Sequence, residues 1–182
     1  YVERCVIDAI KHDITIYAAH TNMDVVANGV SGRMADKLDL HHRQILQPEG
    51  DPMDGNGFGI IGELQQPVES MAFLQQVKEI FRCDRLRYTT PHTSSIQRVA
   101  VCGGAGASFF KQTLARQADI YISGDFKYHD FFLTENRIMI ADIGHYESEQ
   151  FTKEIFYEIL TKKISKFAVQ FSEINTNPIK YL

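Results

Sequence analysis

Val99-Ala-Val-Cys-Gly-Gly-Ala-Gly-Ala-Ser-Phe-Phe110 joins a short apolar run to a glycine-rich turn and a second apolar segment. Such a run is typical of a buried strand that turns directly into a helix. The same arrangement recurs downstream, where Ile120-Tyr-Ile122 is followed by Ser-Gly-Asp125 and residues 137–143 are followed by Gly144-His145. Strands that alternate with helices at this spacing predict an α/β domain with a largely parallel sheet flanked by helices.

The rest of the chain fits the same alternation. Residues 14–19 are predicted to form a strand, and Pro67 is predicted to open a helix, because proline is favoured at the first helical position. The remaining expected elements are helices at 2–12, 29–39 and 147–163 and strands at 43–47, 58–64 and 167–171. In the first of these helices, Val2, Val6, Ile7 and Ile10 form an apolar stripe.

Residues 48–57, Pro-Glu-Gly-Asp-Pro-Met-Asp-Gly-Asn-Gly, are a conspicuous group of turn-forming residues. We therefore expect a linker at 48–57, between a first part of the α/β domain at 1–47 and its remainder at 58–182. The first helix has no capping residue before it, so we also expect the sequence to begin inside a larger protein, with an N-terminal segment of the domain outside it.

Length and composition limit the function classes. A chain of 182 residues with 44% hydrophobic residues suits one domain with a sizeable core. No apolar run approaches the roughly 18–20 residues that span a bilayer, so we expect no membrane segment. A net charge of −4 without a basic stripe makes nucleic acid an unexpected partner. Three widely spaced cysteines predict no disulfide framework and indicate a reducing, cytoplasmic location.

Two polar clusters each follow a predicted strand and each contain a histidine and a carboxylate four residues apart. They are His20 with Asp24 and His145 with Glu149. At the start of a helix this spacing puts both side chains on one face. Imidazole and carboxylate together suit Zn, Mn or Fe, and a carboxylate can bridge two ions. Because parallel strands end at one edge of a sheet, the two clusters are expected to meet there and form a metal site.

Each feature also has an ordinary structural interpretation. Either histidine–carboxylate pair could cap a helix or bind internally. The turn of Gly103, Gly104 and Gly106 could hold a phosphate on its amides, together with Asp125, or could be a plain tight turn, since it lacks the lysine of a P-loop. His129 could hold a metal ligand or substrate in place, or could lie on a helix surface. The adjacent His41 and His42 are expected to be exposed to solvent.

Four motifs carry a family resemblance. Ala18-Ala-His-Thr-Asn-Met-Asp24, Val101-Cys-Gly-Gly-Ala-Gly-Ala-Ser108, Ile122-Ser-Gly-Asp-Phe-Lys-Tyr-His129 and Gly144-His-Tyr-Glu-Ser-Glu149 occur in this order. The set closely resembles the Nif-three-like dinuclear-metal family, whose members are often labelled GTP cyclohydrolase I type 2 homologues. The resemblance extends from about residue 1 to Asn175-Thr-Asn-Pro178.

This resemblance implies a Nif-three-like fold, a subunit of a toroidal homohexamer and two divalent metal ions per subunit, with Zn, Mn or Fe expected. It assigns Asp24, His145 and Glu149 as ligands and places His20 beside the ions, as a ligand or as a residue that supports one. It also places a His-His pair upstream of residue 1, and long members insert a small domain where residues 48–57 lie here.

Two divalent ions would activate water for hydrolysis. The leading hypothesis is therefore a metal-dependent hydrolase that acts on a small-molecule phosphoester, nucleotide or purine ring, without certainty that it is an enzyme. One alternative is a non-catalytic hexameric metal-binding scaffold or protein-interaction module. A DNA-encircling ring is a third hypothesis, and the acidic charge balance argues against it.

Overall fold

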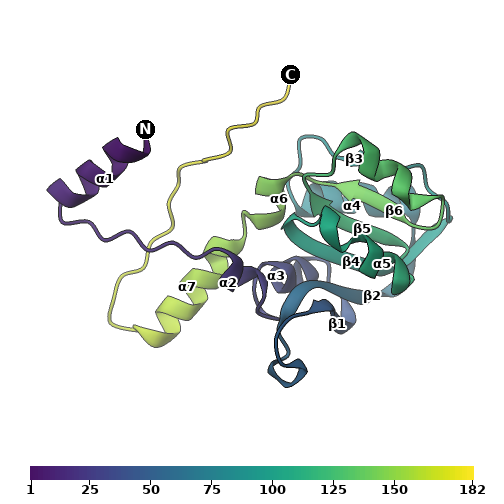
Figure 1. Cartoon of the computed structure of the whole chain (residues 1–182), viewed down its shortest axis with the longest axis horizontal. Coiled ribbons are helices and arrows are strands. Elements are labelled where there is room, and N and C mark those ends of the chain that lie inside the picture. Colours follow the sequence, from purple (N-terminus) through teal and green to yellow (C-terminus); the bar gives the residue numbers. More distant parts are fainter.

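The computed structural model describes the backbone of residues 1–182 and every side chain other than that of residue 52. Its centre is a six-stranded sheet with the order β1-β2-β4-β5-β6-β3. The strands are β1 (His41–Pro48), β2 (Gly57–Glu69), β3 (Arg87–Tyr88), β4 (Ser95–Ala105), β5 (Ile120–Gly124) and β6 (Met139–Asp142). The three strands predicted from the opening motifs therefore lie side by side in the middle of the sheet (Figure 1).

The sheet is mixed, so the expectation of a largely parallel sheet is wrong. Strands β4, β5 and β6 are parallel, whereas β1, β2 and β3 each run antiparallel to their neighbours. The reason lies in residues 48–57, which connect β1 to β2 as a hairpin whose register pairs Pro48 with Gly57. Strands joined by a short hairpin must run in opposite directions, while parallel neighbours need a longer crossover.

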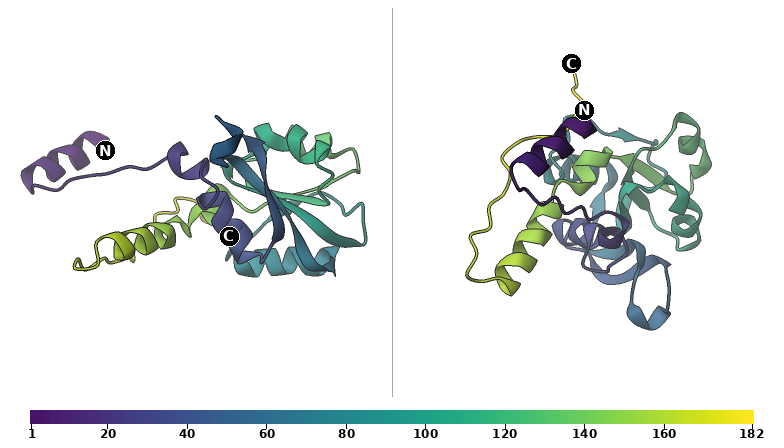
Figure 2. Two further views of the ribbon diagram at one scale, coloured as in Figure 1. Left: turned by 90° about the horizontal axis from the view of Figure 1, so that it is seen from below. Right: turned by 60° about the vertical axis from the view of Figure 1, so that its left-hand side comes forward.

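Helices cover both faces of the sheet, as Figure 2 shows. The α-helices are α1 (Val2–Lys11), α2 (Thr21–Asp24), α3 (Val30–Lys37), α4 (Ser70–Ile80), α5 (Phe110–Ala115), α6 (His145–Glu149) and α7 (Thr152–Lys163). Short 3-10 helices are η1 (Pro52–Asp54), η2 (Ala107–Phe109) and η3 (Tyr128–Thr134). Apolar residues of α3 and α4 pack on one face, and those of α5 pack on the other.

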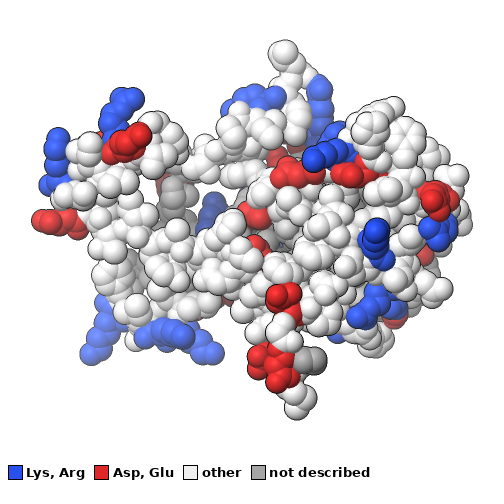
Figure 3. All heavy atoms as spheres, in the orientation of Figure 1, with Lys and Arg blue, Asp and Glu red and all other residues white. Residues whose placement is uncertain are grey.

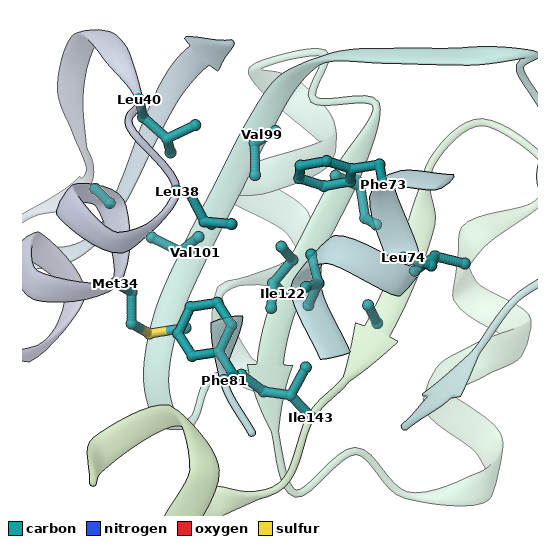
Figure 4. Packing of buried hydrophobic residues seen from close by; sticks show 14 of the residues in the cluster. Met34, Leu38, Leu40, Phe73, Leu74, Phe81, Val99, Val101, Ile122 and Ile143 are labelled. Carbon is teal, nitrogen blue, oxygen red and sulfur yellow. The ribbon is translucent and has the colours of Figure 1, made fainter. Parts of the chain in front are cut away.

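The core explains why the central strands have continuous apolar sequences. In β4, Val99 and Val101 contact the cluster under α3 and α4, whereas Ala100 and Cys102 contact the opposite cluster. Alternate residues of a strand point to opposite faces, so a strand covered by helices on both sides needs apolar residues at every position. Figure 4 shows the first cluster, in which Met34 and Phe81 meet beside the strands.

Two predicted strands are absent from the described backbone. Residues 14–19 and 167–171 contain no strand, since neither segment forms a ladder with another. A strand is stable only when its backbone groups are paired, so an alternating or apolar sequence alone does not produce one. Both segments lie outside the sheet (Figure 1).

Two helix boundaries also differ from the prediction. Pro67 lies within β2, and α4 begins at Ser70 because the Glu69 carboxylate accepts hydrogen bonds from the backbone N–H groups of Met71 (3.0 Å) and Ala72 (2.7 Å). This is the N-cap arrangement that satisfies the free donors of a first helical turn. The helix predicted at 147–163 is divided into α6 and α7, with the buried Phe151 between them.

Helix α1 forms as predicted, but its apolar stripe is exposed. Val2 is 63% exposed and Ile10 is 71% exposed. Figure 1 shows this helix separated from the sheet by the extended segment that leads to α2. Within the described residues, no helix has both the length and the apolar character needed to cross a membrane.

The central parallel strands should dominate the stability of the fold. Ile122 of β5 is fully buried, so Ile122→Ala is expected to lower the free energy of unfolding by about 2–5 kcal/mol through lost burial and a new cavity. Ile16→Ala, at a residue that is 66% exposed, should change it by less than about 0.5 kcal/mol. Urea unfolding measures both, and equal losses would contradict this description of the core.

Candidate metal centre

A cavity of about 300 Å³ lies where β4 ends, beside the N-terminus of α6. Six of the residues predicted from the sequence to form the site line this cavity: His20, Asp24, Gly103, Gly104, His145 and Glu149. The structure thus brings together the two histidine–carboxylate clusters, which are more than 120 residues apart in the chain.

The parallel strands position half of this site as predicted. Because β4, β5 and β6 share one direction, the glycine segment at the end of β4, Asp125 after β5 and His145 after β6 all lie at the same edge. The other half of the site does not come from a strand end: an extended segment leads to His20, which directly precedes the short helix α2, and Asp24 is the last residue of α2. The residue after α2, Val25, is held to β2 by a 2.7 Å hydrogen bond from the Gly57 N–H to the Val25 carbonyl.

His145 makes contacts through both ring nitrogens. Its Nδ1 lies 2.7 Å from Asp125 Oδ2, and its Nε2 lies 3.3 Å from Glu149 Oε1. Glu149 is one helical turn after His145, so the predicted spacing of four does place the imidazole and carboxylate on one face of α6. Asp125, which we expected to contact a substrate or phosphate, contacts His145 in the structure.

The N-terminus of α2 orients the second histidine. The His20 backbone N–H donates to Asn22 Oδ1 at 2.8 Å, and the Thr21 hydroxyl lies 3.0 Å from His20 Nδ1. Among the described side chains, none makes a hydrogen bond with Nε2 of His20. His20 is exposed, consistent with a location at the rim of the cavity.

The electrostatics of the cavity disfavour its two carboxylates in their charged form. Burial raises the pKa of Asp24, and the imidazoles of His20 and His145 offset only part of this rise. Burial also raises the pKa of Glu149; His145 opposes this effect, and the negative charge of Asp24 adds to it. A cation between the two carboxylates would relieve both effects.

The pKa of His145 is shifted by the same neighbours. Burial alone lowers the pKa of an imidazole, but the hydrogen bond to Asp125 and the negative charges of Glu149, Asp125 and Asp24 outweigh it. The pKa of His145 therefore stands above its ordinary value.

The backbone N–H groups of the glycine turn donate hydrogen bonds to serine hydroxyls. The backbone N–H groups of Gly104 and Gly106 donate to the hydroxyls of Ser148 at 2.8 Å and Ser123 at 3.0 Å, and that of Gly103 lies 3.3 Å from the Ser31 hydroxyl. A phosphate on this turn would have to displace these hydroxyls. Anion binding at this turn remains a prediction that the amide geometry does not favour.

The turn also brings the backbone very close to the candidate ligands. Gly104 has a φ of +63°, and a Cβ at this position would lie 2.5 Å from Glu149 Oε1 and 3.2 Å from His145 Cε1. The left-handed conformation favours glycine here, and a larger residue would in addition push the Glu149 carboxylate away from its present position.

The other histidines considered from the sequence, His129, His41 and His42, lie outside the cavity. His129 is exposed on η3, where its ring packs edge-on against Tyr128 at 5.3 Å between centroids, so the structure does not bring it to the other candidate residues. His41 and His42 are exposed on β1, as expected for solvated residues. His42 Nδ1 lies 3.2 Å from Glu63.

Sequence reasoning missed several residues of the site. Ser31, Ser123 and Ser148 support the glycine turn, although Ser123 and Ser148 lie inside the motifs already quoted. Phe58 and Phe109 also line the cavity and stack on each other, with ring centroids 5.1 Å apart and planes inclined by 17°. The sequence contains no signal for this pair, because β2 and η2 meet only in the folded chain.

The candidate metal ligands lie around one cavity but do not form a complete metal site. Among the described side chains, no group of three or more His, Cys, Asp or Glu residues is close enough to hold a metal ion as it stands. The pair formed by His145 and Glu149 is the tightest part of the arrangement, and Asp24 and His20 face it across the cavity.

Comparison with known proteins identifies the family. A model of the Duf34/NIF3 (NGG1p interacting factor 3) family matches residues 1–178. The chain belongs to the Duf34/NIF3 family. The resemblance inferred from the four motifs is thereby confirmed.

Named relatives and solved structures agree with this membership. The GTP cyclohydrolase 1 type 2 homolog of Streptococcus pneumoniae is 36% identical over 184 residues, which cover 97% of this chain and 68% of the relative. The crystal structure of the Staphylococcus aureus hypothetical protein SA1388 matches with a TM-score of 0.84 and 25% identity, over 95% of this chain and 70% of the other.

A third comparison supports the fold alone. The Bacillus cereus protein related to NIF3 has a TM-score of 0.81 and 20% identity, over 95% of this chain and 75% of that protein. The mixed α/β sheet flanked by helices is therefore the Duf34/NIF3 fold.

The raised pKa of Glu149 predicts a pH dependence of the metal-free protein. A carboxyl whose folded pKa is raised stabilises the fold fully below its ordinary value of 4.5, and this contribution is lost as the pH rises through the folded pKa. Glu149→Gln, which cannot ionise, should therefore gain stability relative to the wild type as the pH rises above 4.5. Chemical unfolding of both proteins in the presence of a chelator from pH 4 to about pH 8 tests this. A difference that is constant, or that shrinks with pH, would contradict the shift.

Proposed function

We propose that this chain contributes ligands to a dinuclear metal centre and that the protein is a metal-dependent hydrolase of a phosphoester, nucleotide or purine-ring substrate. The observation that carries the proposal is the convergence of Asp24, His145 and Glu149, with His20, on one cavity at the carboxyl edge of the parallel strands. Membership of a family whose named relatives are GTP cyclohydrolase 1 type 2 homologs supports the same reaction class.

The donor types suit divalent ions such as Zn, Mn or Fe. The set combines imidazole nitrogen with carboxylate oxygen, which these ions accept, and offers two carboxylates of which either could bridge. The paired rise in the pKa values of Asp24 and Glu149 adds an electrostatic argument, because a cation would favour the ionised form of both. Coordination positions that these side chains do not fill would be taken by water or by further ligands.

Different residues of the cavity would bind the metal ions and contact the substrate. Bound divalent ions supply Lewis acidity and activate water near neutral pH. Glu149 and Asp24 would hold the ions close together, and His145 would fix one of them against α6. The rings of Phe58 and Phe109, which stack on each other, add apolar aromatic surface to the same cavity, which would suit the apolar ring of a purine.

The proposal includes the assembly and location that the family resemblance implies, a toroidal homohexamer in the cytoplasm. The exposed apolar stripe of α1 is consistent with burial in an assembly. On the face shown in Figure 3, lysine and arginine side chains are dispersed rather than gathered, and acidic side chains cluster at the tip of the β1–β2 connection. This charge pattern gives no support to a DNA-binding ring.

Removal of the bridging candidate should abolish the centre. Glu149→Gln is expected to lower metal content from about two ions per subunit to one or none and to eliminate hydrolysis of nucleotides and phosphoesters. Glu147→Gln is the matched control, since Glu147 is on the same helix but bonds Asn177 and does not line the cavity. Elemental analysis and a substrate screen measure both effects. Metal bound without turnover of any substrate would support the scaffold alternative, and an unchanged metal content in Glu149→Gln would refute the ligand assignment.

A second test uses the contact at Gly104. Gly104→Ala and Gly50→Ala both place a side chain at positive φ, so both should lose about 1–2 kcal/mol of stability from the backbone conformation, and Gly104→Ala should lose more because of its close contacts. Only Gly104→Ala adds a methyl group against Glu149 and His145, because a Cβ at Gly50 would meet nothing within 4 Å. Metal affinity should therefore fall in Gly104→Ala alone. Isothermal titration with Zn²⁺ measures it, and equal affinities in the two variants would exclude the site from this cavity.

A further inference from the structure

Asp125 holds the ring of His145 from the side opposite to the cavity. The 2.7 Å contact between Asp125 Oδ2 and His145 Nδ1 is shorter than the 3.3 Å contact between His145 Nε2 and Glu149 Oε1. An ionised carboxylate can only accept a hydrogen bond, and each ring nitrogen of His145 faces one; the shorter contact, to Asp125, favours Nδ1 as the protonated nitrogen of a neutral imidazole. The Nε2 lone pair is then directed toward Glu149 and the candidate metal position.

The backbone around Asp125 is fixed on both sides. Before it, Gly124 packs so closely against the start of α6 that a Cβ would lie 2.7 Å from the His145 backbone nitrogen. After it, the Phe126 N–H donates to Asp142 Oδ2 at 3.2 Å. Asp142 is itself buried, and its other oxygen accepts a 3.0 Å hydrogen bond from the Gly144 N–H. The segment that carries Asp125 and the segment that carries His145 are thus held together by contacts that do not involve either side chain.

Asp125 also occupies an unfavourable backbone conformation. Its φ is +58°, in the left-handed region that residues other than glycine seldom adopt. Asparagine and aspartate tolerate this region better than other side chains, but it still has a conformational cost relative to glycine. A glycine would satisfy the turn, so the carboxylate must be explained by what it contacts, and its side-chain partner among the described residues is His145.

We propose that Asp125 is a positioning residue, which fixes the orientation and tautomer of His145 so that Nε2 is available to a metal ion. This inference rests on the proposed metal centre and gives Asp125 a role different from contact with substrate. Carboxylates that bind the distal nitrogen of a ligating histidine raise its basicity and typically strengthen metal binding by about 10–100-fold.

The turn conformation offers two informative variants. Asp125→Gly removes the carboxylate and relieves the positive φ, so it should fold at least as well as the wild type while binding Co²⁺ about 10–100-fold more weakly. Asp125→Asn keeps an oxygen that can accept the Nδ1 proton and also tolerates the left-handed conformation, so its affinity should lie closer to that of the wild type. Asp130→Asn is the control, because Asp130 is in the same segment but accepts from the Lys127 N–H.

Two measurements on the intact protein decide the proposal. Competition with a chelator gives the Co²⁺ affinity, and the visible absorption of bound Co²⁺ reports the ligand geometry. In metal-free protein at a pH where the imidazole is neutral, ¹⁵N chemical shifts of His145 should show the proton on Nδ1 in the wild type and Asp125→Asn and a mixture in Asp125→Gly.

The outcomes separate this inference from the proposed function. If the wild type binds no Co²⁺, Zn²⁺ or Mn²⁺, the proposed metal centre fails, whatever the tautomer of His145. If the wild type binds metal and Asp125→Gly binds it equally tightly with the same absorption spectrum, the role of Asp125 is overturned and the metal centre stands. A loss of affinity in Asp130→Asn as large as in Asp125→Gly would also overturn it.

Discussion

The close contact between three loops at the carboxyl edge of β4, β5 and β6 is the constraint on which the site depends. At Gly124 the backbone approaches the backbone at the start of α6 too closely for any side chain, and at Gly104 it contacts the side chains of Glu149 and His145. Serine hydroxyls from α3, β5 and α6 accept hydrogen bonds from the amides of Gly103 and Gly104, at the end of β4, and of Gly106, just after it. Because packed interiors tolerate little displacement, these contacts set the distance between the glycine turn and the side chains of His145 and Glu149.

The polar groups at this edge form a connected network. Asp125 binds His145, His145 faces Glu149, and Ser148 both accepts from Gly104 and donates to the His145 carbonyl at 2.8 Å. The site therefore combines a rigid support with carboxylates that are unfavourably charged in its metal-free form, which is the combination expected where a protein prepares a cation site. The packing that holds the site in place also buries Asp24 and Glu149, and this burial disfavours their charged forms.

The ends of the chain contrast with this rigid edge. Helix α1, the segment at 14–19 and the residues after α7 carry many exposed apolar side chains, among them Ile10, Tyr17 and Phe167. Single exposed apolar residues are ordinary, but contiguous stripes are typical of surfaces that become buried in an assembly or against another segment. His20 follows one of these segments directly, whereas the C-terminal end of α2 is held to β2 by the hydrogen bond from the Gly57 N–H to the Val25 carbonyl.

The sequence by itself determined the local features whose cause is local. Short apolar runs predicted the buried strands β4, β5 and β6, and the spacing of four placed His145 and Glu149 on one face of α6. The same patterns could not predict pairing, because a ladder needs a partner: 14–19 and 167–171 resemble strands but form none, and the hairpin across 48–57 makes the sheet mixed.

Only the tertiary structure decided which polar groups meet. In the folded chain Asp125 contacts His145, and serine hydroxyls accept hydrogen bonds from the amides of the glycine turn. His129 lies on the surface, and Phe58 stacks on Phe109 beside the candidate ligands. Some of these contacts join residues more than 50 positions apart, and their geometry follows from the packing of whole helices and strands. Spacing along the chain carries no information about such distances, because they are fixed only when helices and strands pack against one another.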